Sequence, residues 1–404
     1  MLMKDARTPA SDEQPLHRPL STPARILMAP GPTNLPPAVQ QALLSPLTGH
    51  KDPVYLRVMD QTAEFLRQVF QTRNALTLAL PGTGGAGMEA GLVNLLEPGE
   101  RVVIGVNGLF GERMVEIARR LGAEVVPIQV PWGAIIPAEA IERELRAKPT
   151  KLVILVHGET STGVLQPVEE VSALCRQYEA LFALDVVATL GGIEVCTDAW
   201  QVDYCYSGSQ KCLSAPPGAA PLTASERAAR VVRGRRQPVA SWYMDLSLHE
   251  RYWQGERVYH HTAPVLTMYA LHEACRLVLE EGLETRFARH RRLYQALVCG
   301  LEALGLELFG DPAHRLPTVA AVRIPSGVND ARVRGILLDE FNIEITGGLG
   351  EYAGRLWRIG VMGYSASETN VTLVLAALEH ALRREGYRVE SGAGVAAATA
   401  ALAD

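Results

Sequence analysis

Lysine and runs of basic residues are scarce in this chain. Only five of the 39 basic residues are lysines, so arginine supplies positive charge almost everywhere. The formal net charge is −5, and Arg233-Gly234-Arg235-Arg236 is the most concentrated basic stretch. A nucleic-acid-binding surface needs a larger basic patch. We therefore expect small molecules as partners and no nucleic acid.

Cysteine pairs and long apolar runs are also lacking. Six cysteines are scattered along the chain without the C-x-x-C pairs that structural zinc sites use. No apolar run reaches the roughly 18 residues that a membrane span requires, and the N-terminus lacks the apolar core of a signal peptide. These absences predict a cytoplasmic protein with reduced thiols and no membrane partner.

The sequence does contain an alternation of apolar runs and amphipathic segments. Strands are predicted at residues 75–80, 101–106, 124–128, 151–157 and 181–186, and helices at 111–121, 135–147 and 168–178. This order predicts an α/β fold with a mostly parallel sheet. The turns that follow the strands then gather along one edge, where α/β proteins place their binding sites.

A second unit of α+β type is predicted after residue 282. It comprises a helix at 283–304, strands at 318–324 and 356–361, and a helix at 367–385. The predicted division is a loose N-terminal extension (1–23), a large domain (45–282), a small domain (24–44 and 283–388) and a C-terminal tail (389–404). The tail is rich in alanine, which is compatible with a helix.

A glycine-rich loop, Gly82-Thr83-Gly84-Gly85-Ala86-Gly87, follows the first predicted strand and opens a helix. It satisfies the dinucleotide pattern G-x-G-x-x-G, but a dinucleotide site also needs an acidic residue at the end of the second strand. Glu97 and Glu100 precede that strand instead. Backbone N–H groups at a helix N-terminus bind any phosphate, so the loop suits the single phosphate of a smaller cofactor. A tight turn without a ligand is the alternative.

Lys211 lies in a stretch of small residues, 206–218, that carries no other charge. A desolvated lysine amine can lose its proton and form a Schiff base, which arginine cannot do. A structural ion pair with a distant carboxylate is the alternative for Lys211. Asp185, which ends the strand 26 residues upstream, either caps a helix or keeps the nitrogen of a pyridine cofactor protonated.

Four motifs together resemble the class V aminotransferases. They are Ser207-Gly208-Ser209-Gln210-Lys211, Asp185-x-Val187-Ala188-x-Leu190-Gly191-Gly192, His157-Gly158-Glu159-Thr160-Ser161-Thr162-Gly163 and Tyr259-His260-His261-Thr262. Within that class the chain is similar to the alanine/serine–glyoxylate branch. The resemblance implies pyridoxal 5′-phosphate as cofactor, ping-pong transamination, and the aspartate-aminotransferase-like fold. That fold has a large mixed, mostly parallel sheet and a small α+β domain made from both chain ends.

The same resemblance implies a role for each cofactor contact. Lys211 would hold the cofactor and move the substrate proton, while Asp185 would face the ring nitrogen. The remaining contacts would be Thr83, Gly84, Gly85 and Gln210 to the phosphate, Phe110 stacked on the ring, Thr160 near the ring oxygen, and Val187 on the opposite ring face. Relatives often have tryptophan where Phe110 stands, and Phe110 could equally be a core residue.

Tyr259 and Thr262 match residues that in this family reach the phosphate from the neighbouring subunit. The resemblance therefore implies a homodimer with shared active sites. The adjacent pair His260-His261 raises the question of a metal. Neighbouring residues point in different directions and the sequence shows no third ligand, so we expect no metal site.

Arg358 matches the arginine that binds the substrate carboxylate in this family. An arginine in an apolar strand is costly to bury without an anionic partner, although an ion pair within the protein would also satisfy it. The resemblance also places Gly31, His50 and Thr160 in the substrate pocket. The loop around Gly31, Pro30-Gly31-Pro32-Thr33-Asn34, needs glycine for close backbone approach.

The donor predicted for glyoxylate is alanine or serine, which would give glycine and a 2-keto acid. (S)-Ureidoglycine–glyoxylate aminotransferases are the alternative, and residues 210–214, 282–287 and 362–365 resemble that branch. However, His50 and Tyr259 stand where we expect glutamine and asparagine in that branch. Without those two amides the polar ureido group would be poorly paired, which favours alanine or serine.

Three other classes of protein fit less well. Cysteine desulfurases need a mobile nucleophilic cysteine, and none lies in the glycine-rich loop at 346–350. A nicotinamide oxidoreductase lacks the acidic residue that its dinucleotide needs. A non-catalytic binding protein would have little use for Lys211, Asp185 and Arg358 together.

Overall fold

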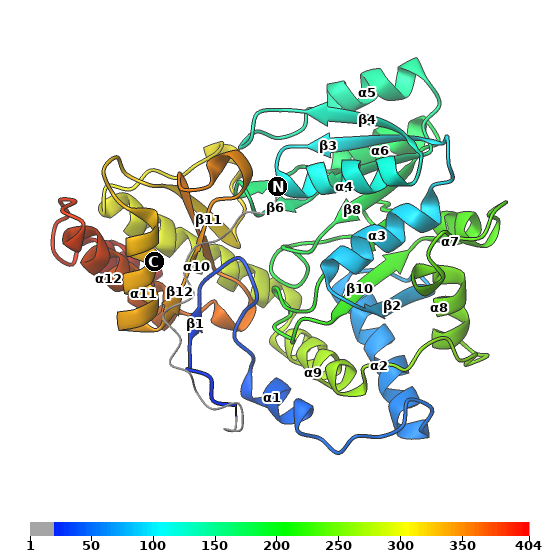
Figure 1. The fold of residues 1–404 in the computed structure, drawn as a ribbon, viewed down its shortest axis with the longest axis horizontal. Helices are drawn as coiled ribbons and strands as arrows, with labels where there is room; N and C mark the ends of the chain where they lie inside the picture. Colours follow the sequence, from blue (N-terminus) through cyan, green and yellow to red (C-terminus); the bar gives the residue numbers. More distant parts are fainter. Residues whose placement is uncertain (1–19, 404) are drawn as a thin grey trace.

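A seven-stranded sheet forms the larger unit of the computed structural model, which describes residues 20–403 (Figure 1). The strands, in spatial order, are β2 (Leu76–Pro81), β10 (Ala219–Ala224), β9 (Tyr204–Tyr206), β8 (Leu181–Asp185), β5 (Leu152–Val156), β3 (Arg101–Val106) and β4 (Glu124–Gln129). Only β10 is antiparallel to its neighbours in this sheet. The sheet is therefore mixed and mostly parallel, as predicted.

The five strands predicted in this region are present, whereas β9 and β10 were not predicted. β9 has only three residues, and β10 reads Ala-Ala-Pro-Leu-Thr-Ala, which is poor in β-branched and aromatic residues. Pairing with β2 and β9 on both sides overrides that weak local preference.

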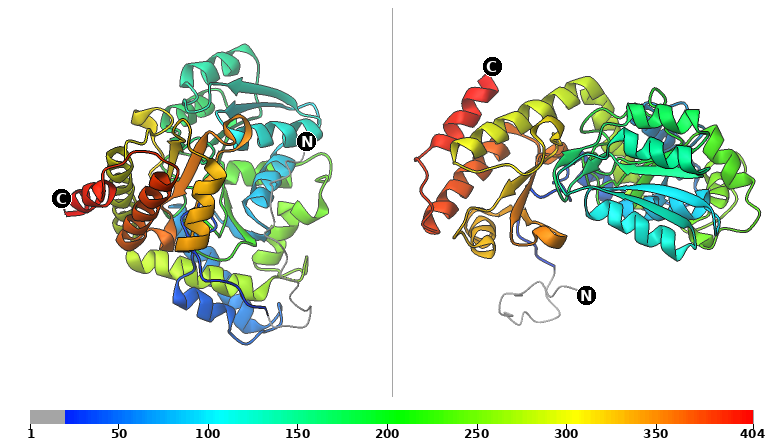
Figure 2. Two further views of the ribbon diagram at one scale, coloured as in Figure 1. Left: turned by 60° about the vertical axis from the view of Figure 1, so that its left-hand side comes forward. Right: turned by 90° about the horizontal axis from the view of Figure 1, so that it is seen from above.

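Helices cover both faces of the large sheet (Figure 2). α3 (Gly84–Leu95) and α4 (Leu109–Arg120) pack on one face, and α5 (Ala138–Ala147) and α6 (Glu169–Gln177) on the other. α2 (Pro53–Val69) and α9 (Val265–Glu281) pack together beside β2 and β10. Two shorter helices, α7 (Glu226–Arg233) and α8 (Leu246–Trp253), follow β10. Because both faces are covered, β3, β5 and β8 are buried along their whole length, which explains their continuous apolar character.

Glycines let α3 approach the sheet closely. A Cβ at Gly91 would lie 2.4 Å from Cε1 of Tyr204, and a Cβ at Gly87 would lie 3.0 Å from Cβ of Tyr206. Tyr204 in turn donates a hydrogen bond to the carbonyl oxygen of Gly87 at 2.7 Å. The last glycine of the G-x-G-x-x-G pattern therefore serves helix-to-strand packing.

The smaller unit contains the three-stranded antiparallel sheet β11 (Val319–Arg323), β14 (Leu356–Gly360) and β13 (Thr346–Gly347). β1 (Ile26–Leu27) pairs with β12 (Ile343–Glu344), so the N-terminal segment joins this unit. Its helices are α10 (Leu283–Ala303), α11 (Asp330–Phe341), α12 (Glu368–Arg384) and α13 (Ala393–Ala403).

The N-terminal and C-terminal segments pack against different parts of the structure. The alanine-rich tail forms α13, which lies against α10 and α12 (Figure 2). α1 (Pro37–Leu43) lies against α9 of the larger unit, whereas β1 lies in the smaller one. The domain boundaries drawn from the sequence stay predictions, and residues 1–19 of the predicted extension lie outside the described residues. Within residues 20–403, no helix combines the length and apolar character that crossing a membrane requires.

Replacing Gly91 by alanine should lower the melting temperature, because the new methyl group would collide with the ring of Tyr204. Overpacking of this kind costs about 1–3 kcal/mol. Gly335→Ala, in α11, is the matched control: no atom lies within 4 Å of the added Cβ. Alanine there should raise the free energy of unfolding by about 0.5–1 kcal/mol. Thermal unfolding monitored by circular dichroism measures both variants. A melting temperature of Gly91→Ala equal to or above that of the wild type would contradict the packing argument.

Candidate active site

A cavity of about 150 Å³ lies at the carboxyl ends of β5 and β8, beside the N-termini of α3 and α4. Its lining residues are Thr83, Gly84, Gly85, Met88, Phe110, Arg113, Val156, Gly158, Thr160, Asp185, Val187, Ala188, Gln210 and Lys211. Nine of these are the cofactor residues expected from the sequence. The fold therefore brings together side chains that are spread over 129 positions of the chain.

The N-terminus of α3 forms one end of the cavity. Thr83 is the N-cap residue, and within the described chain its side chain makes no capping hydrogen bond. A Cβ at Gly84 would lie 2.8 Å from Cγ2 of Val187, so only glycine permits this approach. The buried Oε1 of Gln210 has no hydrogen-bond partner among residues 20–403. Free N–H groups at a helix start, with nearby polar side chains that lack partners, suit a phosphate group.

Asp185 ends β8 and is 3% exposed. Its Oδ1 accepts a hydrogen bond from the backbone N–H of Val187 at 2.8 Å, and its Oδ2 accepts one from the hydroxyl of Tyr206 at 2.7 Å. Burial raises the pKa of this carboxyl to about 6, although the two hydrogen bonds and the positive charge of Lys211 act to lower it. A protonated pyridine nitrogen would supply the cationic partner that this buried carboxylate lacks.

The Lys211 side chain lies against the N-terminal loop. Its Nζ donates a hydrogen bond to the carbonyl oxygen of Pro30. A Cβ at Gly31 would lie 2.4 Å from Cδ of Lys211, and Gly31 has φ +90°, so this position requires glycine twice over. Burial, with Arg358 second, lowers the pKa of the Lys211 amine to about 8. An amine that is partly neutral near physiological pH is suited to act as a nucleophile and a base.

Glu159 lies beside the site and was given no role by the sequence argument. It is fully buried, and its Oε2 accepts a hydrogen bond from the backbone N–H of Phe110 at 3.1 Å. Its Oε1 accepts hydrogen bonds from the N–H and hydroxyl of Ser161. Burial raises the pKa of Glu159 to about 7. Its carboxyl group therefore anchors the start of α4 and with it the Phe110 ring.

Arg113 was also missed. It lines the cavity one turn after Phe110, and its guanidinium lies 5.2 Å from the centroid of the Phe110 ring. The helix predicted at 111–121 begins one residue after Phe110, whereas α4 begins at Leu109. Phe110 and Arg113 are therefore three residues apart on one helix, and such residues share a face.

Arg358, on β14, is 8% exposed and reaches toward the larger unit. Its Nε donates to the carbonyl oxygen of Gly347 at 2.8 Å, and its terminal nitrogen donates to that of Thr160 at 3.4 Å. In the described part of the chain no carboxylate lies within ion-pair distance of it. Burial lowers its pKa to about 10. These properties fit a guanidinium that awaits an anionic ligand.

His50, Tyr259 and Thr262 form a separate group that does not line this cavity. The rings of His50 and Tyr259 have centroids 5.4 Å apart, and the Tyr259 and Thr262 hydroxyls lie 3.2 Å from each other. Tyr259 is 50% exposed, and Thr262 is also exposed. The single chain thus leaves these predicted contacts facing outward.

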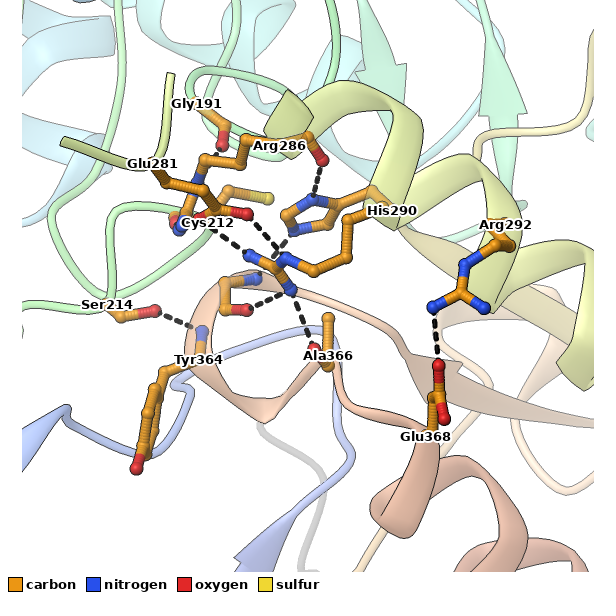
Figure 3. Close-up of polar contacts among 12 residues, drawn as sticks. Gly191, Cys212, Ser214, Glu281, Arg286, His290, Arg292, Tyr364, Ala366 and Glu368 are labelled. Carbon is orange, nitrogen blue, oxygen red and sulfur yellow. Dashed lines mark hydrogen bonds and ion pairs between the residues drawn. The ribbon is translucent and has the colours of Figure 1, made fainter. Parts of the chain in front are cut away.

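A buried network around Cys212 and Ser214, in the loop after Lys211, joins the two units (Figure 3). Arg286 of α10 donates hydrogen bonds to the carbonyl oxygens of Gly191 and Cys212, both at 2.6 Å. One turn later, His290 accepts a hydrogen bond from the backbone N–H of Gly363 at 2.9 Å. The backbone N–H of Tyr364 reaches the hydroxyl of Ser214 at 2.8 Å. The first turns of α10 therefore fix the Lys211 loop relative to the smaller unit.

The described side chains fit pyridoxal phosphate: a helix N-terminus for the phosphate, Asp185 for the ring nitrogen, Phe110 and Val187 for the ring faces, and Lys211 for the aldehyde. The fit rests on unsatisfied groups as well as on shape. They are the Gln210 amide oxygen, which has no hydrogen-bond partner among residues 20–403, and the buried Asp185 and Arg358, which form hydrogen bonds but no ion pair there.

Comparisons with known proteins identify the family of the chain. The model of the class V aminotransferase family matches residues 27–355. The chain is 44% identical over 399 residues to the (S)-ureidoglycine–glyoxylate transaminase of Bacillus subtilis, covering 94% of this chain and 96% of the relative. It is 43% identical over 372 residues to the alanine–glyoxylate aminotransferase of Callithrix jacchus, covering 91% and 90%.

The crystal structure of ureidoglycine–glyoxylate aminotransferase from Bacillus subtilis is similar over nearly the whole fold, with a TM-score of 0.94 at 45% identity. It covers 96% of this chain and 100% of that one. The chain belongs to the class V aminotransferases and is a transaminase that uses pyridoxal phosphate.

Proposed function

We propose that this enzyme transfers the amino group of alanine or serine to glyoxylate, giving glycine and a 2-keto acid by a ping-pong mechanism. The relatives named for alanine and for ureidoglycine match at 43% and 44% identity, so overall similarity does not choose between them. The observation that carries the choice is the pairing of His50 with Tyr259.

The His50–Tyr259 pair presents an imidazole and a phenol side by side, and Lys51 adds a charge 5.2 Å from the Tyr259 ring centroid. A ureido group has a carbonyl oxygen and several N–H groups that need matched amide partners. Two side-chain amides would supply both donors and acceptors, whereas this pair supplies fewer. Each polar group left unmatched costs about 1–3 kcal/mol, which favours the smaller donors alanine and serine.

Bound pyridoxal phosphate supplies an electron sink for the negative charge that develops on the substrate Cα. The residues of the chain then divide the remaining work. Asp185 would keep the ring nitrogen protonated. Lys211 Nζ would take the proton from the substrate Cα and deliver it to the cofactor carbon, for which its lowered pKa is suited. Arg358 orients the substrate by binding its carboxylate at two points.

We further propose a cytoplasmic homodimer with shared active sites. Tyr259 and Thr262 face outward from the single chain, and large apolar side chains are exposed near them in sequence or space: Leu47, Val54, Trp242, Tyr243 and Val258. Such a surface is typical of a subunit interface. The six cysteines form no disulfide, in keeping with a reducing compartment.

Capture of pyridoxal phosphate by the cofactor-free enzyme should accelerate as pH rises and level off above about 8. The neutral amine of Lys211 is the nucleophile, and its pKa is lowered to about 8. With an ordinary lysine pKa the rate would keep rising to about pH 10. Borohydride trapping at timed intervals, followed by peptide mass spectrometry, measures the linked fraction. Lys211→Ala should give no adduct and Lys51→Ala a normal one; an adduct on another lysine would refute the assignment.

The donor preference can be measured as kcat/KM for alanine, serine and ureidoglycine at fixed glyoxylate. We expect alanine or serine to be preferred, because the ureido group lacks matched partners. A tenfold preference for ureidoglycine, worth about 1.4 kcal/mol, would overturn the choice.

A double variant tests the structural reason for this preference. His50→Gln with Tyr259→Asn should raise kcat/KM for ureidoglycine by about tenfold or more, since two hydrogen-bond partners are added. His314→Gln, at a part-exposed histidine that pairs with Asp311, is the control and should change nothing.

Mixed dimers test the shared site. Lys211→Ala and Thr262→Arg subunits should each be inactive alone. Dissociated together and reassembled, they should regain roughly a quarter of wild-type activity, since about half of the dimers are hybrids with one intact site. The proposal would be contradicted if hybrids form, as shown by co-purification through a tag on one subunit, but have no activity. A monomer that is fully active in sedimentation would also contradict it.

A further inference from the structure

Three buried histidines outside the cofactor cavity lie together. His249 belongs to α8, and His260 and His261 precede α9. The centroid of the His249 ring lies 4.5 Å from that of the His260 ring and 5.1 Å from that of the His261 ring. One ligand nitrogen from each ring lies within 4.8 Å of the other two. The prediction of no metal rested on two reasons: neighbouring residues point in different directions, and the sequence shows no third ligand beside the His260-His261 pair. The fold places His249 as a third candidate ligand and brings both neighbouring rings against it.

The backbone determines which nitrogen of two rings is protonated. His249 Nε2 lies 2.8 Å from the carbonyl oxygen of Tyr243, and His260 Nε2 lies 3.3 Å from that of Trp242. A carbonyl oxygen only accepts, so both Nε2 atoms carry the proton and both Nδ1 atoms have a free lone pair. Metal-binding histidines show this arrangement, with the distal N–H held by a backbone carbonyl.

The lone pair of His249 Nδ1 has no hydrogen-bond partner within residues 20–403. His261 Nδ1 lies 2.9 Å from His260 Nδ1 and can donate its proton there. His249 Nδ1 then has no hydrogen-bond partner among the described residues, although His249 is 0% exposed. A buried polar atom without a partner costs about 1–3 kcal/mol, so an aromatic cluster alone does not account for His249.

We propose that His249, His260 and His261 bind one divalent transition-metal ion of the zinc class through their Nδ1 atoms, with the ring proton of His261 moving to its Nε2 on binding. Three imidazoles without a carboxylate suit Zn²⁺, and zinc–nitrogen bonds of about 2.0–2.1 Å require nitrogens about 3.3 Å apart in a tetrahedral site. The 2.9 Å between the Nδ1 atoms of His260 and His261 would widen slightly, and the ligand nitrogen of His249, which lies within 4.8 Å of the others, would move to this spacing.

The bound ion would fasten the segment after α8 to that helix. Tyr259 and Thr262 flank the histidine pair directly, so the site would fix the two side chains that the proposed dimer presents to its partner. This consequence rests on the proposed shared site, whereas metal binding itself does not.

Zn²⁺ titration of the holoenzyme after EDTA treatment and buffer exchange tests the proposal. We expect one Zn²⁺ per chain in competition with a chromophoric chelator, and a rise in melting temperature of several degrees. His249→Gln should weaken Zn²⁺ binding at least tenfold and abolish the rise. His380→Gln, at a partly exposed histidine outside the cluster, is the matched control and should bind as wild type does.

Absence of stoichiometric Zn²⁺ binding, or equal binding by wild type and His249→Gln, would overturn the proposal. X-ray absorption of the wild-type zinc complex needs no variant and covers the case in which His249→Gln does not fold. Three imidazole nitrogens at about 2.0 Å support the site, and an all-oxygen shell overturns it. Zn²⁺ binding with unchanged transaminase kinetics would support the metal site while removing its link to the shared active site.

Discussion

The close contact between α3 and β9 determines the geometry of the cofactor site. Because glycine stands at positions 87 and 91, the helix packs directly on Tyr206 and Tyr204. The Tyr206 hydroxyl then donates to Asp185, and the start of the same helix meets Val187 through Gly84. One packing contact thus sets the spacing between the proposed phosphate site and the carboxylate that faces the ring nitrogen. Precise spacing of this kind is what a catalytic constellation requires.

Burial of charge is the second constraint on this site. Burial raises the pKa of Asp185 to about 6 and that of Glu159 to about 7, and it lowers the pKa of Lys211 to about 8 and that of Arg358 to about 10. Every shift is toward the neutral form, as expected where charges lose solvent without gaining close ion pairs. A cofactor with a cationic ring and a substrate with a carboxylate would relieve this cost, so the site is built for charged ligands.

Outside the cavity, one segment of the chain contains residues of both the proposed subunit interface and the proposed metal site. Residues 259–262 present exposed side chains at both ends, Tyr259 and Thr262, and buried imidazoles between them. The chain bends at His261. Both adjacent imidazoles therefore lie against His249, although neighbouring residues of an extended chain would point in different directions.

The sequence by itself determined five strands of the large sheet and the choice of Lys211 and Asp185 as chemical groups. Both depend on local pattern: apolar runs of strand length, and a lysine in an uncharged stretch. Local pattern could not predict β10, whose alanines and proline become a strand only between β2 and β9. It also could not predict that Glu159 anchors Phe110, or that His249 lies beside His260 and His261. Only the tertiary structure decided these, because each depends on contact between segments whose distance in space is unrelated to their spacing in the chain.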